Sequence, residues 1–219
     1  MLYAHALSYI QEIIPIKVPR DCALVGDELR STNVQPAAGY EVGYDMFRVN
    51  NGSGIRNMTI QGLTGTLPSD GNEWGTRIPT GGAFVTLDPG TGPEDSSVWI
   101  INKSPYVQNV TTFGSACIGM KIDGTMHNSG NKSVVANDFT QVISDGIGYW
   151  ANEAGRSELV SVFTYYCYIG YWATNGGILR ATNGNNSYGS FGSVADGNDP
   201  LETPDAGTVN NRVNEAIVE

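Results

Sequence analysis

Three short segments of the chain decide its fold: Ile118-Gly119-Met120, Ile147-Gly148-Tyr149 and Ile169-Gly170-Tyr171. They recur from position 118 to 147 (29 residues) and from 147 to 169 (22 residues). A repeat of this length, rich in β-branched and aromatic residues and without the pattern of a leucine-rich repeat, indicates a parallel β-solenoid. In such a fold each turn of the chain supplies short strands that stack on the strands of the turn before.

The same segments predict which side chains face inward. Side chains alternate between the two faces of a strand, so Ile118, Met120 and Ile122 are expected to form one inward row. Ile147 and Ile169 are expected to continue the inward column above Ile118, because a slip of one residue in the register would turn every side chain outward. The glycines of the three segments then form a column of small residues.

A second internal match lies nearer the N-terminus. Ile55–Gly62 matches Val107–Gly114 in its leading aliphatic residue, its asparagine, a threonine and the closing glycine. The two segments begin 52 positions apart (55 to 107), which we interpret as two turns plus an insertion. Asn57, Asn109 and Asn137 predict an internal column of asparagines at a corner, where Asn tolerates left-handed backbone geometry. The alternative is three unrelated turn asparagines.

Helical signals are scarce, and short runs bounded by Gly, Pro, Asn or Asp predict strands instead. The predicted strands are Ile14–Val18, Leu24–Val25, Met46–Val49, Ile55–Ile60, Phe84–Leu87, Val98–Ile101, Val107–Phe113, Ile118–Ile122, Val134–Ile143, Leu159–Tyr168 and Ile178–Ala181. Met1–Ile10 is expected to form a short helix or part of one. The fold class is therefore all-β, with an entry segment over residues 1–11, the solenoid over 12–193 and an acidic segment leading out of the repeat over 194–219.

Composition limits the classes of function. Only 16% of the 219 residues are charged, and 12 Lys and Arg against 22 Asp and Glu give a formal net charge of −10. This charge opposes binding to nucleic acids and to anionic lipids. No apolar run reaches the ~18 residues of a membrane span, and the first residues lack the basic start of a secretion signal. We therefore expect a soluble protein without nucleic-acid or membrane partners.

The chain offers no pattern for a metal or a cofactor. Cys22, Cys117 and Cys167 accompany no CxxC or Cys/His cluster, so buried free thiols are expected rather than a disulfide framework or a zinc site. Motifs for nucleotide binding, zinc proteases and EF-hand calcium loops are missing as well. His127 lies in a loop rich in Gly, Asn and Ser and is expected to be solvated.

Four segments of the first turns carry a family resemblance: Ile14-Pro15-Ile16-Lys17-Val18-Pro19, Leu24–Thr32 with its Gly-Asp-Glu-Leu-Arg-Ser-Thr turn, Asp45-Met46-Phe47, and Asn57–Leu63. They resemble the opening of pectin-lyase-like β-helices, and the resemblance extends over about residues 10 to 190. It implies a single-stranded, right-handed parallel β-helix.

A narrower similarity covers Ser104–Val110 through Asn183–Gly189. This stretch is similar to structural proteins of contractile-tailed phages of marine cyanobacteria. The similarity implies a non-enzymatic virion component of the tail fibre or baseplate, often a trimer, which joins other virion proteins during assembly in the host cytoplasm and contacts host surface glycan. A tailspike-like polysaccharide lyase or hydrolase is one alternative, and a glycan-binding adhesin is a second.

Cleavage of a polysaccharide requires paired carboxylates, or calcium-ligating acids with a basic residue. The candidates are charged residues that lie close together in the sequence: Asp138, Asp145, Glu153, Arg156 and Glu158. The chain lacks the Gly-His-Gly and Arg-Ile-Lys segments of pectin-hydrolysing enzymes. Because Asp before Gly is first a turn former, we expect these side chains to cap turns or lie on the surface rather than catalyse.

Aromatic residues are the stronger functional signal. Tyr165, Tyr166, Tyr168, Tyr171 and Trp172 fall close together, with Tyr149 and Trp150 one turn earlier. One interior row cannot hold all these rings, because alternate side chains of a strand face opposite ways. Some rings are expected to face outward, either for burial against a neighbouring subunit or for stacking on sugars. The candidate contact residues are Tyr165, Tyr166, Tyr168, Trp172 and Trp150.

Overall fold

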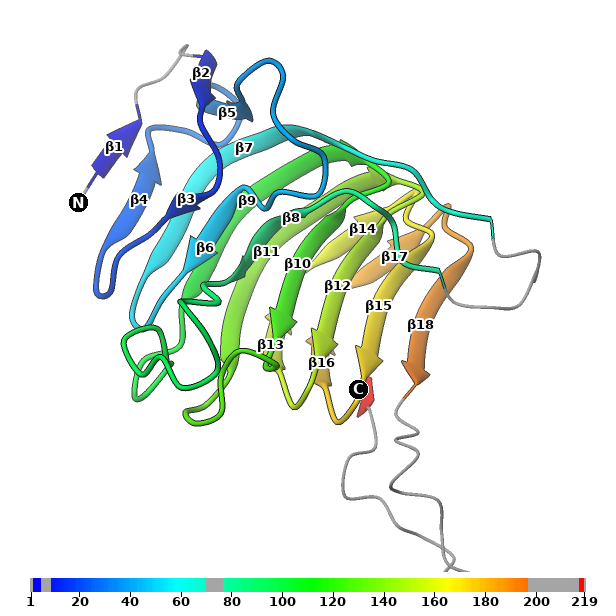
Figure 1. The fold of residues 1–219 in the computed structure, drawn as a ribbon. Helices are drawn as coiled ribbons and strands as arrows, with labels where there is room; N and C mark the ends of the chain where they lie inside the picture. Colours follow the sequence, from blue (N-terminus) through cyan, green and yellow to red (C-terminus); the bar gives the residue numbers. More distant parts are fainter. Residues whose placement is uncertain (1, 5–8, 70–76, 197–216, 219) are drawn as a thin grey trace, which may run out of the picture.

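The computed structural model describes residues 2–4, 9–69, 77–196 and 217–218 (Figure 1). Within these ranges every regular element is a β-strand, as the sequence predicts. The same ranges contain no helix long and apolar enough to cross a membrane. The strands form two sheets, and all their pairings are parallel.

The first sheet has 12 strands. Its main path runs β1-β4-β7-β9-β11-β13-β16-β19, and β2, β5, β14 and β17 pair beside that path. The strands are β1 (Leu2–Ala4), β2 (Tyr9–Glu12), β4 (Ala23–Gly26), β5 (Asn33–Pro36), β7 (Gly54–Thr64), β9 (Tyr106–Ser115), β11 (Ser133–Ser144), β13 (Arg156–Val160), β14 (Phe163–Tyr165), β16 (Ile178–Thr182), β17 (Asn185–Ser187) and β19 (Ile217–Val218).

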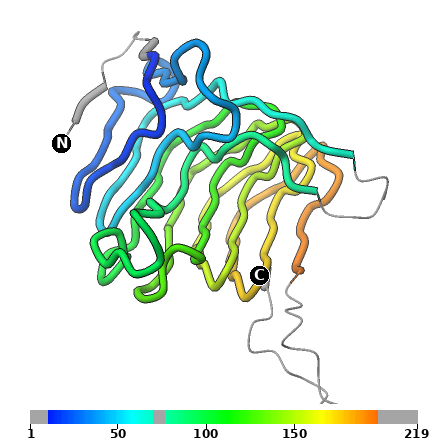
Figure 2. Tube along the Cα trace, in the orientation of Figure 1, coloured from blue at the N-terminus to red at the C-terminus, as the bar shows by residue number. Residues whose placement is uncertain are grey.

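The second sheet has seven strands, in the order β18-β15-β12-β10-β8-β6-β3. They are β3 (Ile16–Lys17), β6 (Phe47–Val49), β8 (Ala83–Leu87), β10 (Ile118–Asp123), β12 (Ile147–Asn152), β15 (Ile169–Thr174) and β18 (Phe191–Asp196). The chain alternates between the sheets, so each turn lies beside the turn before, as the colour sequence of Figure 2 shows. This arrangement is consistent with a parallel β-solenoid.

The strand register confirms the repeat that starts at Ile118. Ile118 pairs with Ile147, which pairs with Ile169, so the three isoleucines form one column. The interpretation of the earlier match is wrong, because Ile55 pairs directly with Val107. These two residues lie on adjacent turns, and the chain between them is lengthened by the segments that join β7 to β8 and β8 to β9.

The isoleucines were expected to face the main core, and this expectation is wrong. Met120 and Tyr149 belong to the main core between the sheets, whereas Ile118 and Ile147 belong to a separate hydrophobic cluster that includes Trp150. Residues two apart on a regular strand share a face. The strands therefore depart from strict alternation at the glycine of each repeat, and this step turns the isoleucines away from the core.

The repeated glycines allow the two sheets to approach closely. A Cβ added at Gly148 would lie 2.5 Å from Cγ2 of Thr164 and 2.6 Å from the carbonyl oxygen of Gly170. Thr164 lies on the first sheet, where its hydroxyl donates to Oδ1 of Asn186 at 2.8 Å. The column of small residues is thus needed because it packs against polar side chains of the opposite sheet.

The turns bend at residues with left-handed backbone geometry. Asn57 (φ 55°) and Asn109 (φ 52°) occupy one corner, and Nδ2 of Asn109 donates to Oδ1 of Asn57 at 3.1 Å. The third member of the column is Asp138 (φ 50°), because Asn137 pairs with Gln108 one position earlier. The predicted asparagine column is therefore correct for two residues, wrong for Asn137, and partly exposed rather than internal.

Three predicted elements differ from the structure. Val98–Ile101 forms no strand, because it lies in a turn-rich segment where the amide of Val98 donates to the carbonyl of Asp95 at 3.2 Å. The helix expected within Met1–Ile10 is wrong for residues 2–4 and 9–10, which are in β1 and β2; residues 1 and 5–8 lie outside the described ranges. Leu159–Tyr168 is interrupted at Ser161 (φ 52°), which separates β13 from β14.

Two of the proposed segment boundaries fall close to strands. β1 and β2 lie largely within residues 1–11 and already pair with β4 and β5 of the first sheet. At the other end, β18 continues to Asp196 and pairs with β15. Of the segment 194–219, only residues 194–196 and 217–218 are described.

Candidate functional site

Large apolar side chains gather on the outer side of the first sheet over successive turns. Phe113, Val142 and Tyr165 pair with one another in a single column, and their neighbours Gln141 and Thr164 are buried. The column side chains are exposed or half-buried. We call this surface the aromatic face, and it consists of Phe113, Val142, Phe163, Tyr165, Tyr166 and Tyr188.

Two stacked tyrosines form the most exposed part of the aromatic face. The rings of Tyr166 and Tyr188 lie 5.4 Å apart between centroids and are inclined by 19°. The side chains are 52% and 79% exposed, respectively. The register sets their stacking, since the amide of Tyr166 donates to the carbonyl of Ser187 on the next turn at 3.0 Å.

Both tyrosines occupy an unfavourable backbone conformation. The φ angles are 63° at Tyr166 and 62° at Tyr188, in the left-handed region that glycine and asparagine adopt more readily than a bulky side chain. Strained residues of this kind concentrate at binding and catalytic sites. The backbone therefore holds two large rings outward at positions where glycine or asparagine would adopt the left-handed conformation at lower energetic cost.

The other candidate aromatics have buried rings. Trp150, Trp172 and Tyr168 belong to the second hydrophobic cluster, and Trp172 is only 4% exposed. Leu67 packs against this cluster from the segment that joins β7 to β8. From the same segment, the guanidinium of Arg77 lies 4.6 Å above the ring of Tyr168. Of the five residues named from the sequence, Tyr166 is exposed and Tyr165 is half-buried on the aromatic face.

The acidic candidates lie at separate corners. Asp138 (φ 50°), Asp145 (φ 55°) and Glu153 (φ 50°) occupy three successive left-handed positions of one turn, and all three are exposed. Seven residues of extended chain separate Asp138 from Asp145, which corresponds to about 20 Å at ~3.3 Å per residue. Glycosidases hold their two carboxyl groups within about 10 Å of each other. Asp138 and Asp145 are therefore too far apart along the strand to form the carboxyl pair of a glycosidase.

Arg156 and Glu158 lie together on β13. They line a shallow pocket of about 270 Å³ with Ser104, Asn131 and Ser133. Oε1 of Glu158 already forms an ion pair with the guanidinium of Arg180 at 3.3 Å. Among the residues that line the pocket, Glu158 supplies the only carboxylate. The pocket therefore lacks the second acid of a hydrolytic pair.

His127 was expected to be solvated, and this expectation is wrong. The side chain is 1% exposed, and neither ring nitrogen has a hydrogen-bond partner among the described residues. Burial lowers the pKa of His127, and the charge of Lys132 acts in the same direction, whereas Asp88 and Asp123 oppose it. The Gly, Asn and Ser composition of the loop concealed this position, because the loop packs against the segment after β8: the amide of Asn128 donates to the carbonyl of Pro93 at 3.1 Å.

The cysteines carry no disulfide. Cys117 and Cys167 are buried free thiols, as predicted, and Cys22 is half-buried. Burial raises the pKa of both Cys117 and Cys167 to about 12, so neither is a reactive thiolate at neutral pH.

The described part of the chain offers no group of three or more His, Cys, Asp or Glu side chains that could hold a metal ion. Comparisons of the chain with protein-family models, with curated proteins and with solved structures give no match.

Proposed function

We propose that the chain is a right-handed, pectin-lyase-like parallel β-helix that serves as a non-enzymatic structural protein of a tailed-phage virion. In this proposal it belongs to the tail fibre or baseplate, is assembled in the host cytoplasm, and uses the aromatic face to contact a second copy of itself. The virion assignment follows from the resemblance of the sequence. The contact surface follows from the geometry of Tyr166 and Tyr188.

The stacked pair of Tyr166 and Tyr188 is the observation that carries the proposal. Large aromatic rings contribute most of the energy at protein interfaces, and exposed apolar surface of this kind marks contact sites. Here two rings stand outward at strained backbone positions beside the column of Phe113, Val142 and Tyr165. Burial of this face against another subunit, most simply in a trimer, compensates for that strain.

The arrangement of charged residues favours contact over cleavage. Asp138, Asp145 and Glu153 lie at separate corners, and the pocket beside Arg156 contains a single, ion-paired carboxylate. A tailspike-like lyase or hydrolase would require these groups to converge on one substrate. A glycan-binding adhesin remains the second candidate, because the flat, stacked rings of Tyr166 and Tyr188 also suit a sugar ring.

Sedimentation velocity of the full chain tests the proposal. The unaltered protein is expected to sediment as an oligomer at micromolar concentration. The double variant Tyr166→Asn and Tyr188→Asn is expected to sediment as a monomer, because asparagine accepts the left-handed backbone while removing the rings. The matched control Val160→Asn alters an exposed apolar residue outside the aromatic face and should leave the oligomer intact.

Two results would contradict the proposal. A monomeric unaltered protein that loses binding to host-envelope polysaccharide in the tyrosine double variant would favour the adhesin. Release of sugar fragments that disappears in the Asp138→Asn, Asp145→Asn variant would favour the enzyme, because asparagine keeps the turn bonds but cannot transfer a proton as a carboxyl group does.

A further inference from the structure

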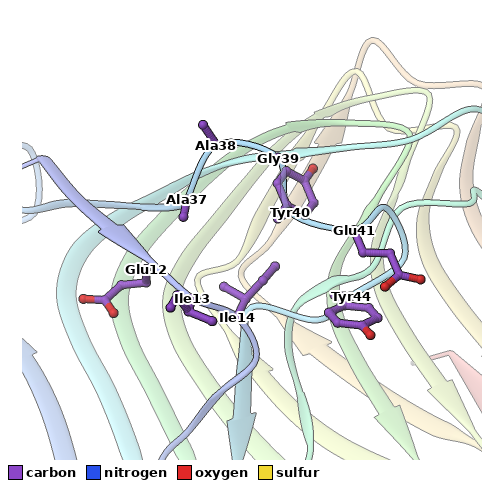
Figure 3. A pocket seen from close by; sticks show the side chains of 9 residues that line it. All are labelled: Glu12, Ile13, Ile14, Ala37, Ala38, Gly39, Tyr40, Glu41 and Tyr44. Atoms are coloured by element: carbon purple, nitrogen blue, oxygen red, sulfur yellow. The ribbon is translucent and has the colours of Figure 1, made fainter.

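A pocket of about 280 Å³ lies between the end of β2 and the loop that follows β5 (Figure 3). Its lining combines apolar side chains with carboxylates: Glu12, Ile13, Ile14, Ala37, Ala38, Gly39, Tyr40, Glu41 and Tyr44. The pocket is on the first turns of the chain and shares no residue with the aromatic face. Its function is therefore a separate question from the proposed function.

The apolar part of the pocket is firmly held. Ile14 is buried in the main core and forms the floor, whereas the adjacent Ile13 is 88% exposed. The hydroxyl of Tyr40 donates to the carbonyl of Gly62 at 3.1 Å and accepts from the amide of Thr64 at 2.7 Å. These two bonds fix the ring of Tyr40, which Figure 3 shows over the centre of the pocket. The site is thus preformed.

The carboxylates of Glu12 and Glu41 stand at opposite ends of this apolar centre (Figure 3). Glu41 accepts a hydrogen bond from Tyr44, and this bond, together with the charge of Glu41, raises the pKa of the Tyr44 phenol. The nearest arginine in sequence, Arg48, is bound to Asp45 at 3.1 Å. No Lys or Arg lines the pocket, and neither glutamate has an ion pair within the described ranges.

Two other pockets of the described chain have lysine or arginine among their lining residues. The pocket on β13 contains both Arg156 and Glu158. A third pocket of about 350 Å³ contains Lys17 beside Asp88, and Lys17 lies 3.3 Å from that carboxylate. Each of these two pockets therefore has a cation of the chain paired with one of its carboxylates, Arg180 with Glu158 and Lys17 with Asp88. The pocket between Glu12 and Glu41 has the same kind of acids, with tyrosine rings where the other two have cations.

We propose that this pocket binds the lysine or arginine side chains of an extended segment of a partner protein. The aliphatic stem of a basic residue packs on Ile13 and the tyrosine rings, and its charged head reaches a carboxylate at either end. An extended segment suits the site because Glu12 and Glu41 stand at opposite ends of the apolar centre, so that one chain lying along the pocket can bring a basic side chain to each carboxylate.

Titration of the isotope-labelled full chain with a blocked peptide tests this proposal. The probe is an acetylated and amidated pentapeptide of alternating valine and arginine, and the control peptide has glutamine in place of arginine. Amide shifts in nuclear magnetic resonance spectra are expected at Ala38, Gly39 and Gly43 with the arginine peptide. Glu12→Gln and Glu41→Gln are each expected to weaken binding by about threefold, and the double variant by about tenfold.

The matched control is Glu28→Gln, which alters an exposed glutamate outside the pocket whose bonds to the amides of Arg30 and Ser31 glutamine can keep. It should bind the arginine peptide as the unaltered protein does. Equal binding of the glutamine peptide, full binding by the double variant, or shifts confined to other turns would each overturn the proposal. A further result would also overturn the proposal: the peptide fails to bind, and the protein is an oligomer that dissociates in the double variant. The occupant of the pocket would then be a second copy of this chain.

Discussion

Two stacked pairs of aromatic rings on neighbouring turns have similar geometry but differ in how far they are exposed. Trp150 and Trp172 stack at 4.7 Å between ring centroids with an inclination of 18°, and Tyr166 and Tyr188 stack at 5.4 Å with an inclination of 19°. The tryptophans are buried, whereas the tyrosines are more than half exposed. The stacking itself is a consequence of parallel register, because equivalent residues of adjacent strands lie about 4.8 Å apart.

Exposure is decided by what covers each pair. Leu67 from the segment between β7 and β8 packs against the cluster that contains both tryptophans, and the ammonium of Lys121 lies 4.6 Å above the ring of Trp150. Nε1 of Trp150 also has an internal partner, since it donates to the hydroxyl of Thr174 at 2.9 Å. No described segment covers Tyr166 and Tyr188 in the same way. A ladder of aromatic rings therefore indicates a contact surface only where the rest of the chain leaves it uncovered.

Truncation of one ring from each pair gives the largest expected difference. Trp172→Ala should lower the free energy of unfolding by about 3–5 kcal/mol, because it leaves a cavity in a closely packed cluster. Tyr188→Ala should change the free energy of unfolding of the single subunit by less than about 1 kcal/mol, because no described part of the same chain covers its ring. Urea denaturation of both variants measures the difference. Similar losses in the two variants would mean that the tyrosine pair is also part of the core.

A second test concerns the glycines that turn the tryptophan side of the strands away from the core. Gly148→Ala should cost about 1–3 kcal/mol, since its Cβ would lie 2.5 Å from Cγ2 of Thr164 and 2.6 Å from the carbonyl oxygen of Gly170. Gly92→Ala is the matched control, because no atom lies within 4 Å of its added Cβ. That variant should stay within about 0.5 kcal/mol of the unaltered protein. Tryptophan fluorescence reports the unfolding of both variants.

The sequence correctly predicted an all-β chain with parallel strand pairing, and one column of the register. The repeated Ile-Gly-Met and Ile-Gly-Tyr segments were sufficient to predict parallel stacking, because only a parallel register pairs both the first and the third residues of each segment with their equivalents in the next. The face that the column occupies was predicted wrongly. A prediction from strict alternation of side chains does not account for the irregularity at Gly119 and Gly148. No local sequence pattern indicates which face of the strand a residue next to such a glycine occupies.

The candidate site was predictable only in outline. Aromatic density correctly predicted that some rings face outward, and Tyr166 does so. The cluster that contains Trp150 and Trp172 also contacts Leu67, which lies more than eighty residues earlier in the chain, and such a contact leaves no local trace in the sequence. Tyr188 was missed because it follows a run of Asn, Gly and Ser, although its spacing of 22 residues from Tyr166 equals that of the isoleucines at 147 and 169.

The smallest expected effect concerns a third stacked pair, Tyr149 and Tyr171, whose rings lie 5.6 Å apart in the main core. Burial raises the pKa of Tyr171 from an ordinary value of 10.0 to about 12. The unfolded chain therefore loses this proton at lower pH than the folded chain does. The stability contributed by the protonated phenol is complete below pH 10 and is lost as the pH rises toward 12.

Tyr171→Phe isolates this dependence. The variant should be less stable at neutral pH by about 1 kcal/mol, because it leaves the carbonyl of Val162 without the hydroxyl that donates to it at 3.1 Å. Its free energy of unfolding should then fall less steeply between pH 10 and 12 than that of the unaltered protein, while the two curves run parallel between pH 7 and 9. Identical slopes in the alkaline range would show that the Tyr171 hydroxyl is open to water, and the inner pair would then be exposed in the same way as Tyr166 and Tyr188.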